Sequence, residues 1–270
     1  MSGLVITADD LGMSPGVTRG VLEACRNGVV RSASLLVTFP DAAEAATLAR
    51  AEPRLEIGLH LDVVGGYPIS DPARVRSLVD ADGRFHRLAE FIARLITGRI
   101  RAAELAVEIR AQSDRAAALG IEAAAWDSHR HVHLMPPVLR VVAPIARERG
   151  VRWLRRAGPP RGGAAMKARL LGISTALGSP FAHGIPGNDW YVDLSSLRQR
   201  PDAAAVALLA AHGGLGELGA HPGHPDAALE ASGDGLILRR HDDLMVLTDP
   251  LLRAALGEGT VRHRVPAGGR

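Results

Sequence analysis

Four short polar motifs carry most of the residues in this sequence that could do chemistry. Each follows an apolar run that resembles a buried strand, so each would deliver a carboxylate or an imidazole to the point where a strand ends. Parallel α/β folds gather their reactive groups there, because the carboxyl ends of their strands share one rim. The motifs are TADDLG with Asp9 and Asp10, GLHLD with His60 and Asp62, DSHRHVH at 127–133, and GAHPGH with His221 and His224.

The DSHRHVH motif is the strongest indication of a metal site. Crowded imidazoles resist joint protonation, and a divalent cation removes that problem by taking neutral nitrogens as ligands. If the segment is extended, its period of two predicts one face holding Asp127, His129, His131 and His133, with Arg130 and Val132 opposite.

A set of two histidines and one aspartate leaves coordination positions open for water and substrate, which is typical of catalytic rather than structural sites. Asp9 and Asp10 are adjacent at the tip of one strand, so their side chains point in different directions. One can therefore bind the metal while the other accepts a proton from the bound water.

Taken singly, the motifs also have explanations without chemistry. An Asp-Asp pair after a strand is often a turn or a helix cap. A lone His60 is often a hydrogen-bonded structural histidine, and His221-Pro222 can simply end a strand. Their shared position at strand ends is what favours a site.

Short apolar runs alternate with longer helical patterns along the chain, which predicts a parallel sheet. The length of 270 residues suits a deformed (β/α) barrel, complete or incomplete, in one domain spanning 1–270. A doubly wound open sheet is the competitor, but no GxGxxG follows the first strand. Strands are expected at 4–7, 34–38, 56–59, 123–128, 151–155 and 215–220. Helices are expected at 15–28, 41–51, 88–97, 102–119, 137–149, 164–177, 201–212 and 250–256, with a long loop at 62–86.

Composition excludes several other classes. The net charge is +3, and the arginines are scattered among acids rather than clustered, while aromatic residues make up only 3%. That combination argues against nucleic-acid binding. The single Cys25 allows no internal disulfide, and neither a signal peptide nor a membrane span is evident. We therefore expect a cytoplasmic protein.

The ordered motifs TADDLGMSPGV, EACRNGVV, GLHLD, DSHRHVHLMP and AHPGHPD together resemble the YdjC-like carbohydrate deacetylase family, which includes chitooligosaccharide (chitin disaccharide) deacetylases. The likeness runs from about residue 4 to the LTDP at 247–250, with the domain core at about 4–256. It implies a deformed (β/α) barrel, one divalent metal ion and hydrolysis of an N-acetyl group from an amino sugar.

The resemblance also assigns roles to individual residues. Asp9 matches the catalytic base, and His221 matches the histidine of the late HP motif, a candidate general acid. Asp10, His60 and His129 match the metal ligands, and we expect Asp127 and His131 to support these ligands or contact substrate. The metal is Mg²⁺ or Zn²⁺. Arg130 stands where family members often have histidine, and 158–187 matches poorly, so the acetylated sugar is left open.

Two other functions compete with deacetylation. A metal-dependent phosphoesterase on a barrel scaffold would favour a second metal and cationic phosphate clamps. A non-catalytic sugar-binding protein would be expected to have lost Asp9 or a metal ligand, and all are present. The partners we expect are a small carbohydrate substrate and, from the family, a second copy of the chain in a homodimer.

Overall fold

The computed structural model describes residues 3–157, 166–196, 203–257 and 259–265. Its strands, all paired in parallel within these ranges, form a sheet in the order β5-β4-β3-β2-β1-β7-β6, and β8 adds to β1. No pairing of the edge strands β5 and β6 occurs among the described residues. The predicted α/β fold is therefore confirmed, as an incomplete barrel. The strands are β1 (Gly3–Leu11), β2 (Ser32–Leu35), β3 (Glu56–Leu61), β4 (Ala125–Ser128), β5 (Trp153–Leu154), β6 (Trp190–Asp193), β7 (Leu215–Ala220) and β8 (Val261–Arg262).

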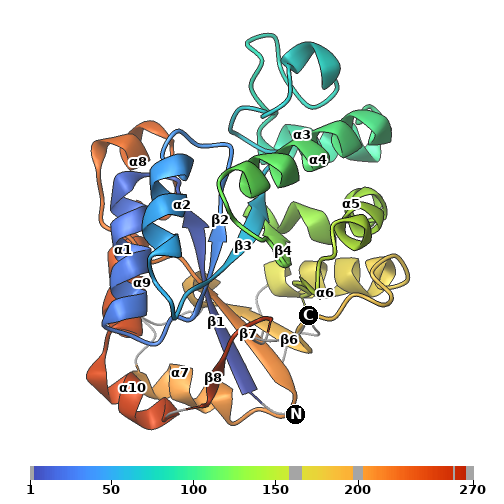
Figure 1. Ribbon diagram of the computed structural model, residues 1–270. Coiled ribbons are helices and arrows are strands. Elements are labelled where there is room, and N and C mark those ends of the chain that lie inside the picture. The colour runs from blue at the N-terminus through green and yellow to red at the C-terminus, as the bar shows by residue number, and fades with distance from the viewer. Residues whose placement is uncertain (1–2, 158–165, 197–202, 258, 266–270) are drawn as a thin grey trace.

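Helices cover the outside of this sheet. In Figure 1, α1, α2, α8 and α9 form a group on one side of the strands, and α3 to α6 lie on the other. No helix in the described ranges has the length and apolar character needed to cross a membrane. The helices are α1 (Pro15–Arg26), α2 (Ala42–Arg50), α3 (Leu88–Ile96), α4 (Ala102–Ala118), α5 (Pro136–Glu148), α6 (Met166–Gly178), α7 (Ala203–Ala210), α8 (Ala227–Ala231), α9 (Ile237–Leu247) and α10 (Pro250–Leu256).

Local sequence signals explain several boundaries. The Ser14 hydroxyl accepts a hydrogen bond from the Val17 N–H and caps α1, and Pro15 occupies the first helical position, as its fixed φ favours. The residue before α2 does not cap this helix with its side chain. Asp41 has helical backbone angles and makes no capping bond, because its carboxylate accepts the Thr18 hydroxyl at 2.6 Å instead.

Two elements near the site were not predicted, namely β6 and α9. β6 pairs with β7 and ends at Asp193, while α9 packs against α1. The second strand also begins at Ser32, two residues before its predicted start. Part of the predicted helix at 164–177 and of that at 201–212 lies outside the described residues.

Candidate active site

A pocket of about 70 Å³ opens at the carboxyl ends of the strands, with room for only a few water molecules or a small chemical group. Six residues singled out from the sequence as site residues line it, whereas Asp127 lies buried behind it. The lining residues are Asp9, Asp10, His60, Ser128, His129, Arg130, His131, Asp193, Ser195, His221, Asp234 and Leu236.

A bulge at the end of β1 lets two adjacent aspartates face this pocket. Neighbouring residues of a regular strand point to opposite faces. Asp10, however, has a φ of 65°, and the pairing of β1 with β2 shifts register between Ala8 and Leu11. A left-handed residue of this kind re-aims the side chain. Both carboxylates therefore reach the site, and they face different partners.

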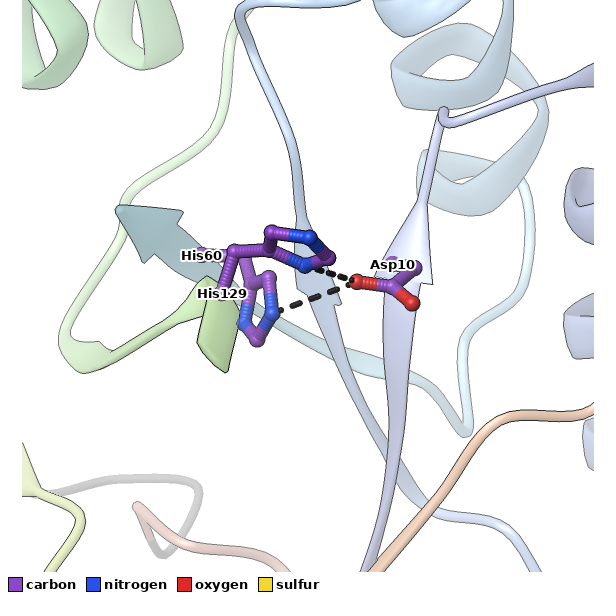
Figure 2. A group of neighbouring side chains, drawn as sticks. All are labelled: Asp10, His60 and His129. Atoms are coloured by element: carbon purple, nitrogen blue, oxygen red, sulfur yellow. Dashed lines mark hydrogen bonds and ion pairs between the residues drawn. The ribbon is translucent and has the colours of Figure 1, made fainter. Parts of the chain in front are cut away.

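Asp10 lies between two imidazoles. Its Oδ1 is 2.9 Å from His129 Nδ1 and 3.3 Å from His60 Nε2. Figure 2 shows both rings directed at this carboxylate. One potential ligand atom from each of the three residues lies within 4.8 Å of those of the other two. Protein ligands about 2 Å from one cation stand roughly 3 to 3.5 Å apart, and one carboxylate with two imidazoles is a common donor set for a catalytic metal. The residues present therefore fit a single divalent cation.

His60 is held from behind by Asp127. The two residues are direct partners in the β3–β4 register, and His60 Nδ1 lies 2.7 Å from Asp127 Oδ1. A ring nitrogen bonded to a carboxylate fixes the orientation of the imidazole and directs the other nitrogen at the metal position. Burial by itself would lower the pKa of His60, but the Asp127 and Asp9 charges raise it to about 10.

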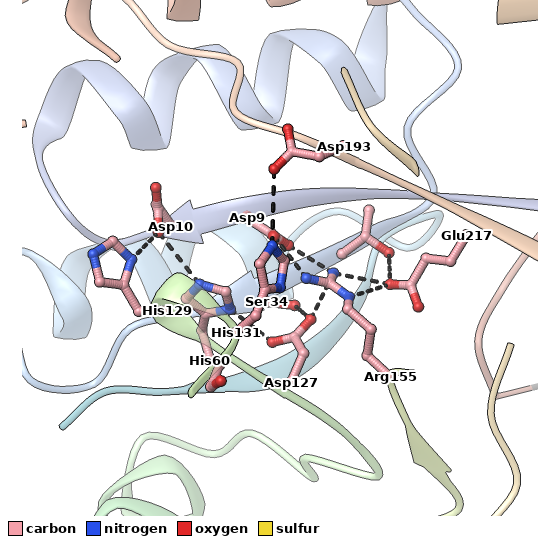
Figure 3. Close-up of polar contacts among 12 residues, drawn as sticks. Asp9, Asp10, Ser34, His60, Asp127, His129, His131, Arg155, Asp193 and Glu217 are labelled. Atoms are coloured by element: carbon pink, nitrogen blue, oxygen red, sulfur yellow. Dashed lines mark hydrogen bonds and ion pairs between the residues drawn. The ribbon is translucent and has the colours of Figure 1, made fainter. Parts of the chain in front are cut away.

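Arg155 follows β5 and lies at the centre of a buried charge cluster (Figure 3). Its guanidinium binds both oxygens of Asp9, at 2.7 and 2.8 Å. It also contacts Asp127 Oδ2 at 2.7 Å and Glu217 Oε1 at 2.8 Å. Burial disfavours an ionised Asp127, yet Arg155 and His60 hold the pKa of that carboxyl well below its usual range.

This cluster bears on a second group of potential metal ligands, Asp9, His60 and Asp127. A cation there would have to displace Arg155 from two buried carboxylates. Removing the partner of a buried charge typically costs about 3 to 5 kcal/mol. The geometry therefore favours one cation, at Asp10, over two.

The extended conformation expected for DSHRHVH is wrong. β4 ends at Ser128, and His129–Leu134 form a 3₁₀ turn in which Arg130 and His131 have φ values of 55° and 57°. A turn does not preserve a period of two, so the histidines separate. Arg130, expected on the opposite face, instead lines the pocket beside His129 and His131.

His133 is the histidine that leaves the site. Its Nδ1 lies 2.5 Å from the Ser128 hydroxyl, and its Nε2 lies 3.0 Å from the Arg155 carbonyl oxygen. Both ring nitrogens have hydrogen-bond partners within the protein, so His133 links the turn to the end of β5.

Asp193, at the end of β6, lies between two histidines of the pocket. Its carboxylate oxygens are 3.8 Å from His131 Nε2 and 3.9 Å from His221 Nδ1. Burial would raise the pKa of Asp193, but the contact with His131 and the His221 charge hold it well below its ordinary value. His221 itself follows β7, and its backbone N–H donates to Asp243 Oδ2 at 2.9 Å.

The other two residues of the rim motifs have structural contacts. Asp62 accepts hydrogen bonds from the Val64 N–H and the Thr38 hydroxyl, and His224 pairs with Glu23. Neither lines the pocket.

Several charged residues of the site region were not predicted from the sequence. Two had a usable signal, since Arg155 and Asp193 stand at the ends of apolar runs, like the motifs that were recognised. Glu217 lies inside a glycine-rich strand, and Arg240 belongs to α9, whose sequence looks like an ordinary polar helix. These residues include Arg155, Asp193, Glu217, Asp234 and Arg240.

An incomplete α/β barrel with one carboxylate and two imidazoles gathered at its rim defines a class of barrel proteins with a candidate cation site at the strand ends. The chain belongs to one family in particular: a family model described as YdjC-like protein matches residues 3–258.

Named relatives and a solved structure agree with this family. The chain is 34% identical over 249 residues to a carbohydrate deacetylase of Brevibacillus brevis, covering 91% of this chain and 90% of that protein. It is 30% identical over 260 residues to a chitooligosaccharide deacetylase of Klebsiella pneumoniae, covering 94% of each. A crystal structure from Enterococcus faecalis V583, of a candidate cellobiose-phosphate cleavage protein, superimposes with a TM-score of 0.80 at 26% identity, covering 96% and 95% of the two chains.

Proposed function

We propose that this protein is a metal-dependent carbohydrate deacetylase, a hydrolase that removes the N-acetyl group from an acetylated amino sugar or oligosaccharide. The observation that carries the proposal is the convergence of Asp10, His60 and His129 in a pocket that Asp9 and His221 also line. Relatives across most of the chain, named as carbohydrate deacetylases, support the substrate class. The pocket is small enough to select an acetamido group while the rest of the sugar stays outside.

Asp10, His60 and His129 would hold the cation, Mg²⁺ or Zn²⁺. When bound, such a cation polarises a carbonyl group and makes water more acidic. Asp9 then accepts a proton from the attacking water, and Arg155 fixes the direction of its carboxylate. His221 donates a proton to the departing amine, because a neutral amine leaves far more readily than its anion. Asp127 orients His60, and Asp193 orients His131 and His221.

A phosphoesterase is the second candidate. It would favour two metal ions about 3.5 to 4 Å apart. The pairing of Asp9 and Asp127 with Arg155 argues against a second ion. Metal counting separates the two functions, since about two equivalents per chain would favour the phosphoesterase.

Removing and restoring the metal tests the proposal. The protein is stripped with a chelator, then given Mg²⁺ or Zn²⁺ with N-acetylglucosamine oligosaccharides, and acetate release is measured. We expect no acetate from the stripped protein and restored release with one of the two ions. Absence of acetate with metal bound would contradict the choice of substrate and favour a sugar-binding protein or a different acyl group.

A further inference from the structure

The two oxygens of Asp10 have different partners. Oδ1 faces His60 and His129, whereas Oδ2 lies 2.7 Å from the Arg240 guanidinium. We propose that Arg240 is a positioning residue of the metal site, which keeps Oδ2 occupied so that Asp10 offers the cation a single oxygen. The inference rests on the proposed metal site and adds to it a residue far away in the sequence, on α9.

Arg240 is built into this position from several sides. It is fully buried, and its Nε donates to Asp234 Oδ2 at 2.8 Å. Its side-chain stem packs over Gly223, where an added Cβ would lie 3.2 Å from Arg240 Cδ. Its backbone carbonyl accepts the Gly223 N–H at 3.1 Å. The guanidinium therefore has little freedom to leave Asp10. Through this contact, the placement of α9 fixes the carboxylate at the end of β1.

The pairing has a chemical consequence. A carboxylate that binds a cation through both oxygens fills two coordination positions, whereas a catalytic site needs positions for water and substrate. A hydrogen bond from an arginine N–H to one carboxylate oxygen keeps that oxygen from binding the cation. Arg240 would thus preserve open positions that three protein ligands alone do not guarantee.

The same turn of α9 offers a matched control. Asp243 is buried three residues after Arg240, and its carboxylate accepts the N–H of His221, which also lines the pocket. Replacing it should disturb α9 and the loop at His221 without touching Asp10. A general effect of loosening α9 is therefore separable from an effect on the metal ligand.

The experiment measures Zn²⁺ and Mg²⁺ affinity of the metal-free full chain by calorimetry or chelator competition. The variants are Arg240→Gln, Arg240→Lys, the charge-balanced Arg240→Gln/Asp234→Asn and Asp243→Asn. Loss of a partner behind a metal ligand typically weakens binding about 10- to 100-fold. We expect that loss in both variants that contain Arg240→Gln, because a released Asp10 carboxylate can turn away from His60 and His129 and this outweighs the gain of a second free oxygen. We expect a smaller loss in Arg240→Lys, and affinity within about threefold of wild type in Asp243→Asn. The d–d absorption of bound Co²⁺ should also change in Arg240→Gln and not in Asp243→Asn.

The outcomes separate the two proposals. Wild-type affinity in the folded Arg240→Gln or charge-balanced variant, even with a lower melting temperature, would overturn the role of Arg240 and leave the metal site standing. Equal losses in Asp243→Asn would also overturn it, because the effect would then belong to α9 as a whole. A wild-type chain that binds neither ion would instead overturn the metal site itself, and this inference with it.

Discussion

His60 and His133 are both buried, and their pKa values move in opposite directions. Burial disfavours the charged form of each. His60 faces the carboxylates of Asp127 and Asp9, which raise its pKa to about 10. For His133 burial is the largest cause, and the pKa falls to about 3. The charges around each ring, rather than its burial, therefore decide the direction in which its pKa moves.

The low pKa of His133 predicts a pH-dependent stability. The unfolded chain binds a proton near pH 6.5, while the folded chain stays neutral down to about pH 3. Stability from this group is therefore complete above about pH 6.5 and is lost as the pH falls toward 3. Replacing His133 with Gln should remove about 1 kcal/mol of the decline in unfolding free energy between roughly pH 7 and 5.5. Urea unfolding of both proteins at several pH values measures it, and parallel declines would contradict the assignment.

Asp9 allows a direct test of the proposed base. Asn has the same shape without the charge, so Asp9→Asn should lower turnover about 10²- to 10⁴-fold, the usual contribution of general acid–base catalysis. Metal affinity should stay within a few-fold. Because Asp9 also pairs with Arg155, Glu217→Gln serves as the control: it removes another carboxylate partner of Arg155 but does not line the pocket. Turnover at the wild-type level in Asp9→Asn would remove Asp9 from the mechanism.

At the scale of elements, α4 holds the segment that follows β3. Its side chains at 104, 108 and 112 recur every four residues and so share one helix face. Gln112 accepts the Asp62 N–H, Glu108 accepts those of Ile69 and Ser70, and Glu104 accepts that of Ser77. The long loop predicted at 62–86 is thus tied to the barrel along much of its length.

Glu108→Gln should loosen this segment. An amide has one acceptor oxygen and turns its NH₂ group toward one of the two backbone donors. A buried donor left without a partner costs about 1 to 3 kcal/mol. We expect a lower unfolding free energy and faster hydrogen exchange at Ile69 and Ser70. Asp114→Asn on the same helix breaks only a surface pair with Arg149 and should cost under about 1 kcal/mol. Unchanged exchange in Glu108→Gln would show that the segment is held by other contacts.

Some elements of the fold could be predicted from the sequence and others could not. Apolar runs and caps located most strands and helices, because those signals are local. The turn at Arg130 and His131 was missed because its left-handed residues are imposed by contacts with distant segments, such as His133 with Arg155. The predicted residues of the metal site converge because each stands at the end of a strand. The parallel strands then bring these ends together at one edge of the sheet. Asp234 and Arg240 carry no such positional signal.

At the scale of the whole molecule, an arginine that follows β8 contacts polar groups buried inside the barrel. Arg264 lies just after β8 and donates to Ser34 Oγ and the Ala33 carbonyl at 2.8 and 2.7 Å, and contacts Asp127 Oδ2 at 3.2 Å. With Arg155 it balances the buried carboxylates of the interior. That the chain forms one domain and assembles as a homodimer stays a prediction.

Arg264→Met should therefore destabilise the entire fold. It removes the donors to Ser34 and Ala33 and one of the cationic partners of Asp127, which keeps Arg155 and His60. We therefore expect a cost of about 3 kcal/mol, near the lower end for breaking a buried pair, and a melting temperature roughly 10 °C lower. Arg262→Met changes the neighbouring exposed arginine of β8 in the same way and should leave the melting temperature nearly unchanged. Similar melting temperatures for the two variants would contradict a sealing role for Arg264.

The pairing of Asp127 with Arg264 also affects the order in which contacts can form during synthesis of the chain. The two residues are separated by 137 positions, and a ribosome adding about 5 to 20 residues per second makes the second roughly 7 to 27 seconds after the first. During that interval Asp127 can pair with His60 and Arg155, which are synthesised earlier, but it lacks Arg264. The strands around β1 can pair early, but the interior reaches its final charge balance only after Arg264 has been synthesised.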